Sequence, residues 1–70
     1  MTPVEYVQHI RVGKARELLE FTRRTVDQIA WSVGYEDAAA FRKLFHRITG
    51  LSPQDYRQRF SAPTPLAEVA

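Results

Sequence analysis

The side chains in this sequence that are best suited to chemistry are basic and lie close together in its second half. They are Arg42, Lys43, His46 and Arg47, and no Asp or Glu occurs from residue 38 to residue 54. Basic clusters of this kind bind phosphate by charge, and an arginine can also hold a guanine edge through paired hydrogen bonds. A run of charge is more often a solvated surface, so the cluster points to nucleic acid only if the fold gathers it on one face.

The spacing of the cluster places it on one side of a predicted helix over residues 37–49. The apolar positions of this segment repeat at helical spacing: Phe41, Leu44, Phe45 and Ile48. A second set has the same spacing on the opposite side: Ala39, Arg42, Lys43 and His46. This pattern is typical of a helix with one buried face and one face in solvent. Asp37 precedes it as a cap, and Gly50 follows it as a stop.

A second predicted helix precedes this one, and the two form a helix-turn-helix over residues 25–49. Thr25 is placed to cap it, with Gln28 as the reciprocal partner of a capping box. Its apolar residues follow one helical face: Val26, Ile29, Ala30 and Val33. Gly34 suits the left-handed residue that ends many helices, and the small Ala30 lets two helices cross closely. Two amphipathic helices joined at a glycine are also common in helical proteins that bind no DNA.

On the DNA-binding interpretation, residues 37–49 form a recognition helix that lies in the major groove of double-stranded DNA. The residues expected at the base edges are Ala38, Ala39, Arg42 and Lys43, whereas His46 and Arg47 are expected to reach phosphates one turn later. The alanines offer no hydrogen bonds, so we expect few direct base contacts and a large contribution from phosphate charge.

The remaining elements complete an all-α chain with one small domain. Residues 3–21 are predicted to form a long helix, opened by a Thr2–Glu5 capping box with Pro3 at its first position. Its two halves carry separate apolar stripes, which suggests different neighbours at its two ends. Gly13 lies mid-helix, either as a tolerated flaw or as a point of close approach. Ser52-Pro53 begins a short terminal helix over residues 53–60, and residues 61–70, with two prolines and no periodicity, are predicted to be a disordered tail.

Composition narrows the classes of function. The 70 residues carry a net charge of only +2. They contain no cysteine, which excludes disulfides and thiolate metal sites and is compatible with the cytoplasm. His9 and His46 have no second ligand at metal spacing, so neither a metal nor another cofactor is expected. No nucleophile elbow or phosphate loop is present, so we expect no enzyme. No apolar run approaches the length of a membrane span.

The order of these residues resembles the AraC/XylS family of transcription regulators. The resemblance covers residues 2 to 60 and rests on these positions: Arg11, Val12, Ala15, Leu19, Ile29-Ala30, Gly34-Tyr35, Phe41, Phe45, Gly50, Ser52-Pro53 and Tyr56-Arg57. It implies a homeodomain-like three-helix unit preceded by the helix that, in the family, joins two helix-turn-helix units. The first unit and the sensing domain of the family would then lie outside these 70 residues.

The resemblance also carries residue roles with it. Ala38, Ala39, Arg42 and Lys43 take the groove-facing positions, and Thr25 with nearby backbone amides takes a phosphate at the start of its helix. The sequence departs from the family at two places, since Lys43 stands where arginine is usual and Ala39 where serine is frequent. A lysine at position 43 can still contact phosphate or guanine, but without the planar fork of arginine.

Two other interpretations stay open. The chain could be a helical protein-interaction module that docks RNA polymerase or another domain. Tyr6, Val7 and Ile10 on the first helix favour this, because an exposed apolar face promotes partner binding or self-association. Alternatively, the chain could be a fragment of a regulator without independent activity.

Overall fold

The regular structure is entirely helical in the computed structural model, which describes residues 1–61. The elements are α1 (Pro3–Phe21), α2 (Val26–Ser32), α3 (Ala38–Thr49) and α4 (Pro53–Phe60). The all-α fold predicted from the sequence is confirmed. The tail predicted over residues 61–70 lies, beyond Ser61, outside the described residues. Within residues 1–61, no helix is both long enough and apolar enough to cross a membrane.

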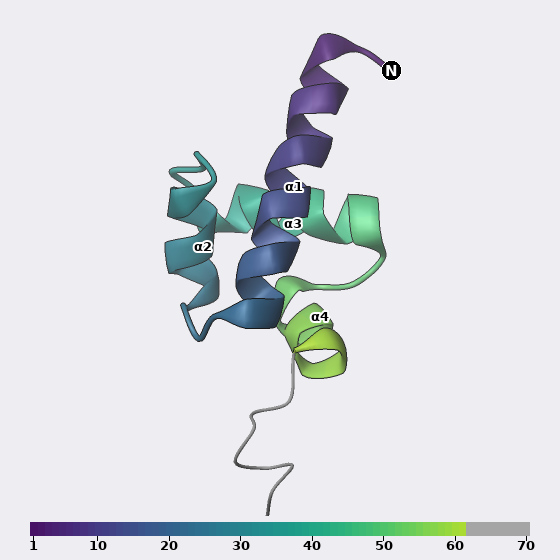
Figure 1. Cartoon of the computed structure of the whole chain (residues 1–70). Helices are drawn as coiled ribbons and strands as arrows, with labels where there is room; N and C mark the ends of the chain where they lie inside the picture. The colour runs from purple at the N-terminus through teal and green to yellow at the C-terminus, as the bar shows by residue number, and fades with distance from the viewer. Residues whose placement is uncertain (62–70) are drawn as a thin grey trace, which may run out of the picture.

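The long helix α1 packs against the three shorter helices with only part of its length. In Figure 1, α1 crosses in front of α3, with α2 at one side and α4 below, and its N-terminal half extends beyond the other helices. Its second half supplies three core residues, Val12, Ala15 and Leu19. In its first half Tyr6, Val7 and Ile10 are 60, 44 and 54% exposed, so this stripe lies outside the core of the described residues.

The core joins that second half of α1 to the helix-turn-helix. Its buried members are Val12, Ala15, Leu19, Ile29, Ala30, Val33, Phe41, Leu44, Phe45 and Tyr56. Ile48 and Val26, both predicted to be buried, are only partly buried at its border. Ala30 is fully buried, as expected for the small residue at the crossing of α2 and α3. The close-approach interpretation of Gly13 is wrong, because within residues 1–61 no atom from another element lies within 4 Å of the position its side chain would take.

A row of aromatic rings crosses the core and links the turn to α4. The ring centroids are 5.8 Å apart for Tyr35 and Phe41, 5.8 Å for Phe41 and Phe45, and 5.5 Å for Phe45 and Tyr56. The last pair meets edge to face, the arrangement that aromatic quadrupoles favour. Phe60 continues the row, with its centroid 4.7 Å from that of Tyr56.

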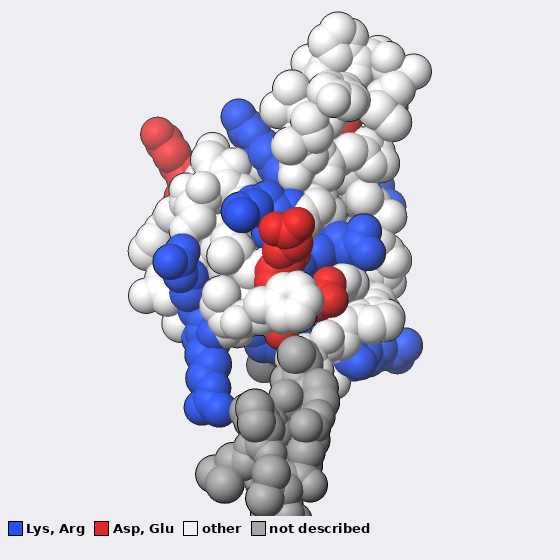
Figure 2. Space-filling model, viewed as in Figure 1, with Lys and Arg blue, Asp and Glu red and all other residues white. Residues whose placement is uncertain are grey.

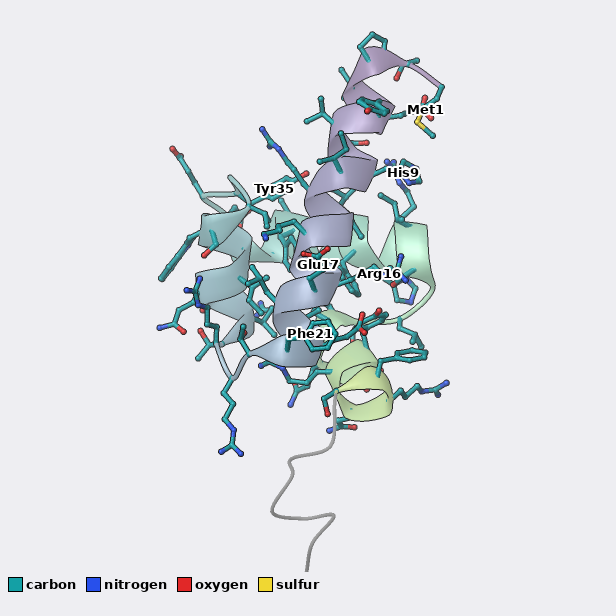
Figure 3. All side chains as sticks on the ribbon, in the orientation of Figure 1. Met1, His9, Arg16, Glu17, Phe21 and Tyr35 are labelled. Carbon is teal, nitrogen blue, oxygen red and sulfur yellow. The ribbon has the colours of Figure 1, made fainter. Side chains whose placement is uncertain are left out.

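Polar contacts fix α4 against α1. Arg16 of α1 extends toward α4 (Figure 3), where its Nε donates to the Tyr56 hydroxyl at 3.0 Å. That hydroxyl in turn donates to the Glu20 carboxylate. Arg57 donates from Nε to the Leu19 carbonyl and from a terminal nitrogen to the Thr22 carbonyl, each at 3.2 Å. Since these carbonyls belong to the end of α1, where helices leave acceptors unpaired, Arg57 caps that end by charge and hydrogen bonds.

Local signals determine where the helices begin and end. The Thr25–Gln28 capping box is complete in both directions. The predicted box at Thr2 is only half formed: its hydroxyl accepts from the Glu5 amide, while the Glu5 carboxylate accepts from that hydroxyl rather than from the backbone. At the end of α2, Gly34 has a φ of 100°, and the amide of Tyr35 bonds the Ala30 carbonyl. With the bond from Gly34 to Trp31, this is a Schellman motif.

Candidate nucleic-acid interface

The exposed face of α3 is the candidate interface, and the Asp37 cap and the Gly34 turn set where it begins. At about 3.6 residues per turn, Ala39, Lys43 and His46 lie opposite the core residues of this helix. Arg42 lies at one edge of the face and Arg47 at the other. All five side chains are exposed. The two-faced helix predicted from the spacing is therefore present.

Arg42 lies at the edge nearest α2 and is held there by an acid. One of its terminal nitrogens donates to Oδ1 of Asp27 at 2.9 Å, which closes an ion pair across the helix-turn-helix. Both side chains are about half exposed, at 52% for Arg42 and 51% for Asp27. The pair therefore lies on the surface of the protein, not in the core.

Arg47 lies at the opposite edge and is held by a neutral group. Its terminal nitrogen donates to the side-chain oxygen of Gln8 at 3.2 Å, so α1 reaches the same face as α2 does. Between the two arginines, Lys43 and His46 form no ion pair with any residue of the described part of the chain. The face thus combines two arginines oriented by neighbouring helices with two polar side chains that no ion pair within residues 1–61 restrains.

The other predicted site residues lie at the margins of this face. Ala38 is only partly exposed and packs against the core, whereas Ala39 and the neighbouring Ala40 are exposed. Thr25 is exposed at the start of α2, but its hydroxyl accepts from the Gln28 amide and its amide donates to the Gln28 side chain. Its polar groups are therefore already used in the cap.

Three residues that shape this region were missed by the sequence reasoning. Asp27 and Gln8 hold the two arginines, and Arg11 stacks on the turn with its guanidinium carbon 5.3 Å from the centre of the Tyr35 ring. Asp27 carried no signal beyond being an acid in the first turn of a helix. Arg11 had one signal, since it belongs to the resemblance, but without a role.

Comparison with known proteins identifies the family to which this chain is related. A family model described as a helix-turn-helix domain matches residues 1–59. The relatives found include the MmsAB operon regulatory protein of Pseudomonas aeruginosa, which is 38% identical over 58 residues. The transcriptional activator RhaR of Pectobacterium carotovorum is 42% identical over 60 residues, and the activator RhaS of Shigella boydii is 41% identical over 58 residues.

The chain belongs to the AraC/XylS-type helix-turn-helix family. The resemblance drawn from the sequence is thereby confirmed. The three alignments cover 83, 86 and 83% of this chain but only 19, 21 and 21% of the relatives, so the chain spans about a fifth of their length. No solved structure matches the chain.

Proposed function

We propose that this AraC-type chain is a DNA-reading part of a transcription regulator and that α3 enters the major groove with its exposed face toward the bases. The observation that carries the proposal is the exposed face of α3, where basic side chains lie opposite a core built into a helix-turn-helix. The names of the relatives support it, since RhaR and RhaS are described as transcriptional activators. In such units the recognition helix contacts bases with its N-terminal half.

The proposed roles follow from position on this face. Ala39, Arg42 and Lys43 lie nearest the bases, and Ala38 adds only the exposed part of a methyl group. His46 and Arg47, one turn later, contact phosphates, and the backbone amides that follow Thr25 at the start of α2 contact another. Arg47 is the cation assigned to a phosphate and a protonated His46 would add a second, so the logarithm of affinity should fall with the logarithm of salt concentration at a slope of about −1 to −2.

The test is a titration of duplex DNA between about 50 and 200 mM salt. Replacing Arg42 and Lys43 together (Arg42→Ala/Lys43→Ala) should weaken binding about 10-fold or more by removing the proposed base contacts, whereas Arg47→Ala should flatten the salt slope by about one unit. The matched control is Lys14→Ala/Arg59→Ala, which removes the same charge from α1 and α4 and should leave affinity and slope near the wild-type values. Equal effects of the two double variants, or affinity that does not depend on salt, would contradict the proposal.

A second candidate function is protein docking through the first half of α1. Figure 2 shows the protruding end of α1 as a largely white surface, on which little charge is visible. A shallow apolar groove continues it toward the turn and is lined by Pro3, Val4, Val7, Gln8, Arg11 and Tyr35. Exposed apolar area of this kind favours association. We propose a second copy of the chain as its first occupant, with RNA polymerase as the alternative partner.

Sedimentation over a concentration series tests this second candidate. The wild-type chain should form dimers as its concentration rises, and Val7→Ser/Ile10→Ser should remain monomeric. Trp31→Ser is the control, because Trp31 is also 60% exposed but lies on α2. A wild-type chain that stays monomeric at high concentration would rule out self-association.

A further inference from the structure

We propose that Asp27 determines base specificity on this surface by restricting Arg42 to a guanine and opposing its contact with phosphate. The inference rests on the proposed function, which it deepens by assigning an acid to a face otherwise described by its bases. The chemical class of the recognised group is the major-groove edge of a G·C pair.

The first step of the argument is the position of the pair. Asp27 lies in the first turn of α2, and Arg42 lies in the first half of α3, on the part of the recognition helix that approaches bases. The 2.9 Å contact joins them across the turn. Because both side chains are about half exposed, the pair is accessible to a molecule that binds the face of α3.

The second step concerns the geometry of a guanidinium. Its N–H donors lie in one plane at fixed angles, so anchoring one terminal nitrogen also restricts the directions of the remaining donors. A free arginine on a helix surface has many rotamers and can reach whichever phosphate is nearest. When an acid anchors one side of the guanidinium, the N–H groups on its other side point in fixed, nearly parallel directions. This geometry suits the two adjacent acceptors O6 and N7 of guanine.

The third step concerns charge. The Asp27 carboxylate neutralises Arg42, so the pair as a whole gains little from phosphate, whose binding depends on net cationic charge. Contact with guanine depends on hydrogen bonds and survives this neutralisation. The second carboxylate oxygen is an acceptor that could also take a hydrogen bond from the N4 amine of cytosine. Asp27 thus lowers the affinity for DNA of random sequence more than the affinity for a site with G·C at this position.

Arg47 provides the internal comparison. It lies on the same helix and is also held by a neighbour, but Gln8 is neutral, so Arg47 keeps its full charge. We therefore assign Arg47 to phosphate and Arg42 to a base. The difference between these two arginines lies in the charge of the residue that orients each of them.

The variant Asp27→Asn separates this role from a structural one. Exposed ion pairs contribute little to stability, so the variant should fold. It also removes a negative charge from the first turn of a helix, where such charges are favourable. Asp55→Asn is the matched control, because Asp55 lies in the first turn of α4 and forms no ion pair with any of residues 1–61.

The experiment is a selection from randomised duplexes with the 70-residue wild-type chain, Asp27→Asn and Asp55→Asn, followed by titration of selected and random duplexes. We expect wild-type sites to share a G·C pair whose preference falls about 5-fold or more in Asp27→Asn. Affinity for random duplex should rise about 3-fold in the same variant. Asp55→Asn should match the wild type on both measures. In an Arg42→Ala background, Asp27→Asn should leave the base preferences unchanged, because there is no arginine left to restrict.

The outcomes distinguish this inference from the proposed function. If Asp27→Asn and the wild type select the same bases with the same affinity for random duplex, the role of Asp27 is overturned and the proposed function stands. The same holds if Asp27→Asn acts equally in the Arg42→Ala background. A wild type that binds duplex without any base preference overturns this inference and also the base contacts of the proposed function. A wild-type chain that binds no duplex overturns the proposed function and this inference together.

Discussion

The guanidinium carbon of Arg11 lies 5.3 Å from the centre of the Tyr35 ring, so α1 holds the turn of the helix-turn-helix from outside. Tyr35 in turn begins the aromatic row through Phe41, and Figure 3 shows it beside α1. The same guanidinium lies 3.4 Å from the position a side chain at Gly34 would take. One residue of α1 thus contacts both the ring and the glycine that define the turn.

Removing the Arg11 charge should loosen this turn. Arg11→Met keeps the length of the side chain but loses the attraction to the Tyr35 ring, which should lower the free energy of unfolding by about 0.5–1 kcal/mol. Urea unfolding of the variant beside Lys14→Met measures it, since Lys14 is an exposed cation on the same helix. Equal stability of the two variants would show that the Arg11–Tyr35 contact contributes nothing.

Replacing Gly34 and Gly13 with alanine should change the free energy of unfolding in opposite directions. Gly34→Ala forces a left-handed φ of 100° on alanine, at a cost of about 1–3 kcal/mol, and its methyl group would touch the Arg11 side chain. Gly13→Ala enters open space within a regular helix and should stabilise by about 0.5–1 kcal/mol. Thermal or urea unfolding of both variants checks this. Destabilisation by Gly13→Ala would mean that a neighbour approaches α1 at this point after all.

Tyr56→Phe should cost stability near neutral pH, because it removes the hydrogen bonds with Arg16 and Glu20 while keeping the ring. The expected loss is about 1–2 kcal/mol. Urea unfolding of wild type and variant at matched pH values measures this difference and its pH dependence.

The difference in unfolding free energy between the wild type and Tyr56→Phe should shrink at alkaline pH. Burial is the largest cause that raises the pKa of Tyr56 above its ordinary value of 10.0; the bond from Arg16 lowers the pKa, and the bond to Glu20 raises it. The folded chain therefore holds the phenol proton more tightly than the unfolded chain does. The contribution of the Tyr56 phenol to stability is complete below its pKa in the unfolded chain, and it disappears as the pH rises through its pKa in the folded chain. A difference that instead grows above pH 10 would contradict the direction of this shift.

Arg57→Met should detach α4 from the end of α1. The variant loses the bonds to the carbonyls of Leu19 and Thr22, and bonds to charged groups contribute about 1.5–3 kcal/mol when well shielded. Since Arg57 is only partly buried, we expect the lower part of that range. Arg59→Met, an exposed arginine of the same helix, serves as the control in denaturant unfolding. Equal stability of the two variants would remove Arg57 from the α1 cap.

Much of the fold could be predicted because its signals are local. The cap at Thr25, the proline at residue 53 and the glycines at the ends of α2 and α3 act within one helical turn. The periodicity of Phe41, Leu44 and Phe45 likewise follows from helix geometry alone. The half-formed box at Thr2 shows the limit, since the same residues can satisfy a cap in more than one way.

Spacing within single helices was enough to define the helices themselves, the buried face of α3 and the basic residues on its other face. The neighbours that those residues meet depend instead on how the helices pack together. Asp27 reaches Arg42 across 15 positions, and Gln8 reaches Arg47 across 39. The first contact depends on how α2 crosses α3, and the second on how α1 crosses α3. Periodicity carries no information about crossing angles. The two arginines look alike in the sequence, and their different charge surroundings arise from packing alone.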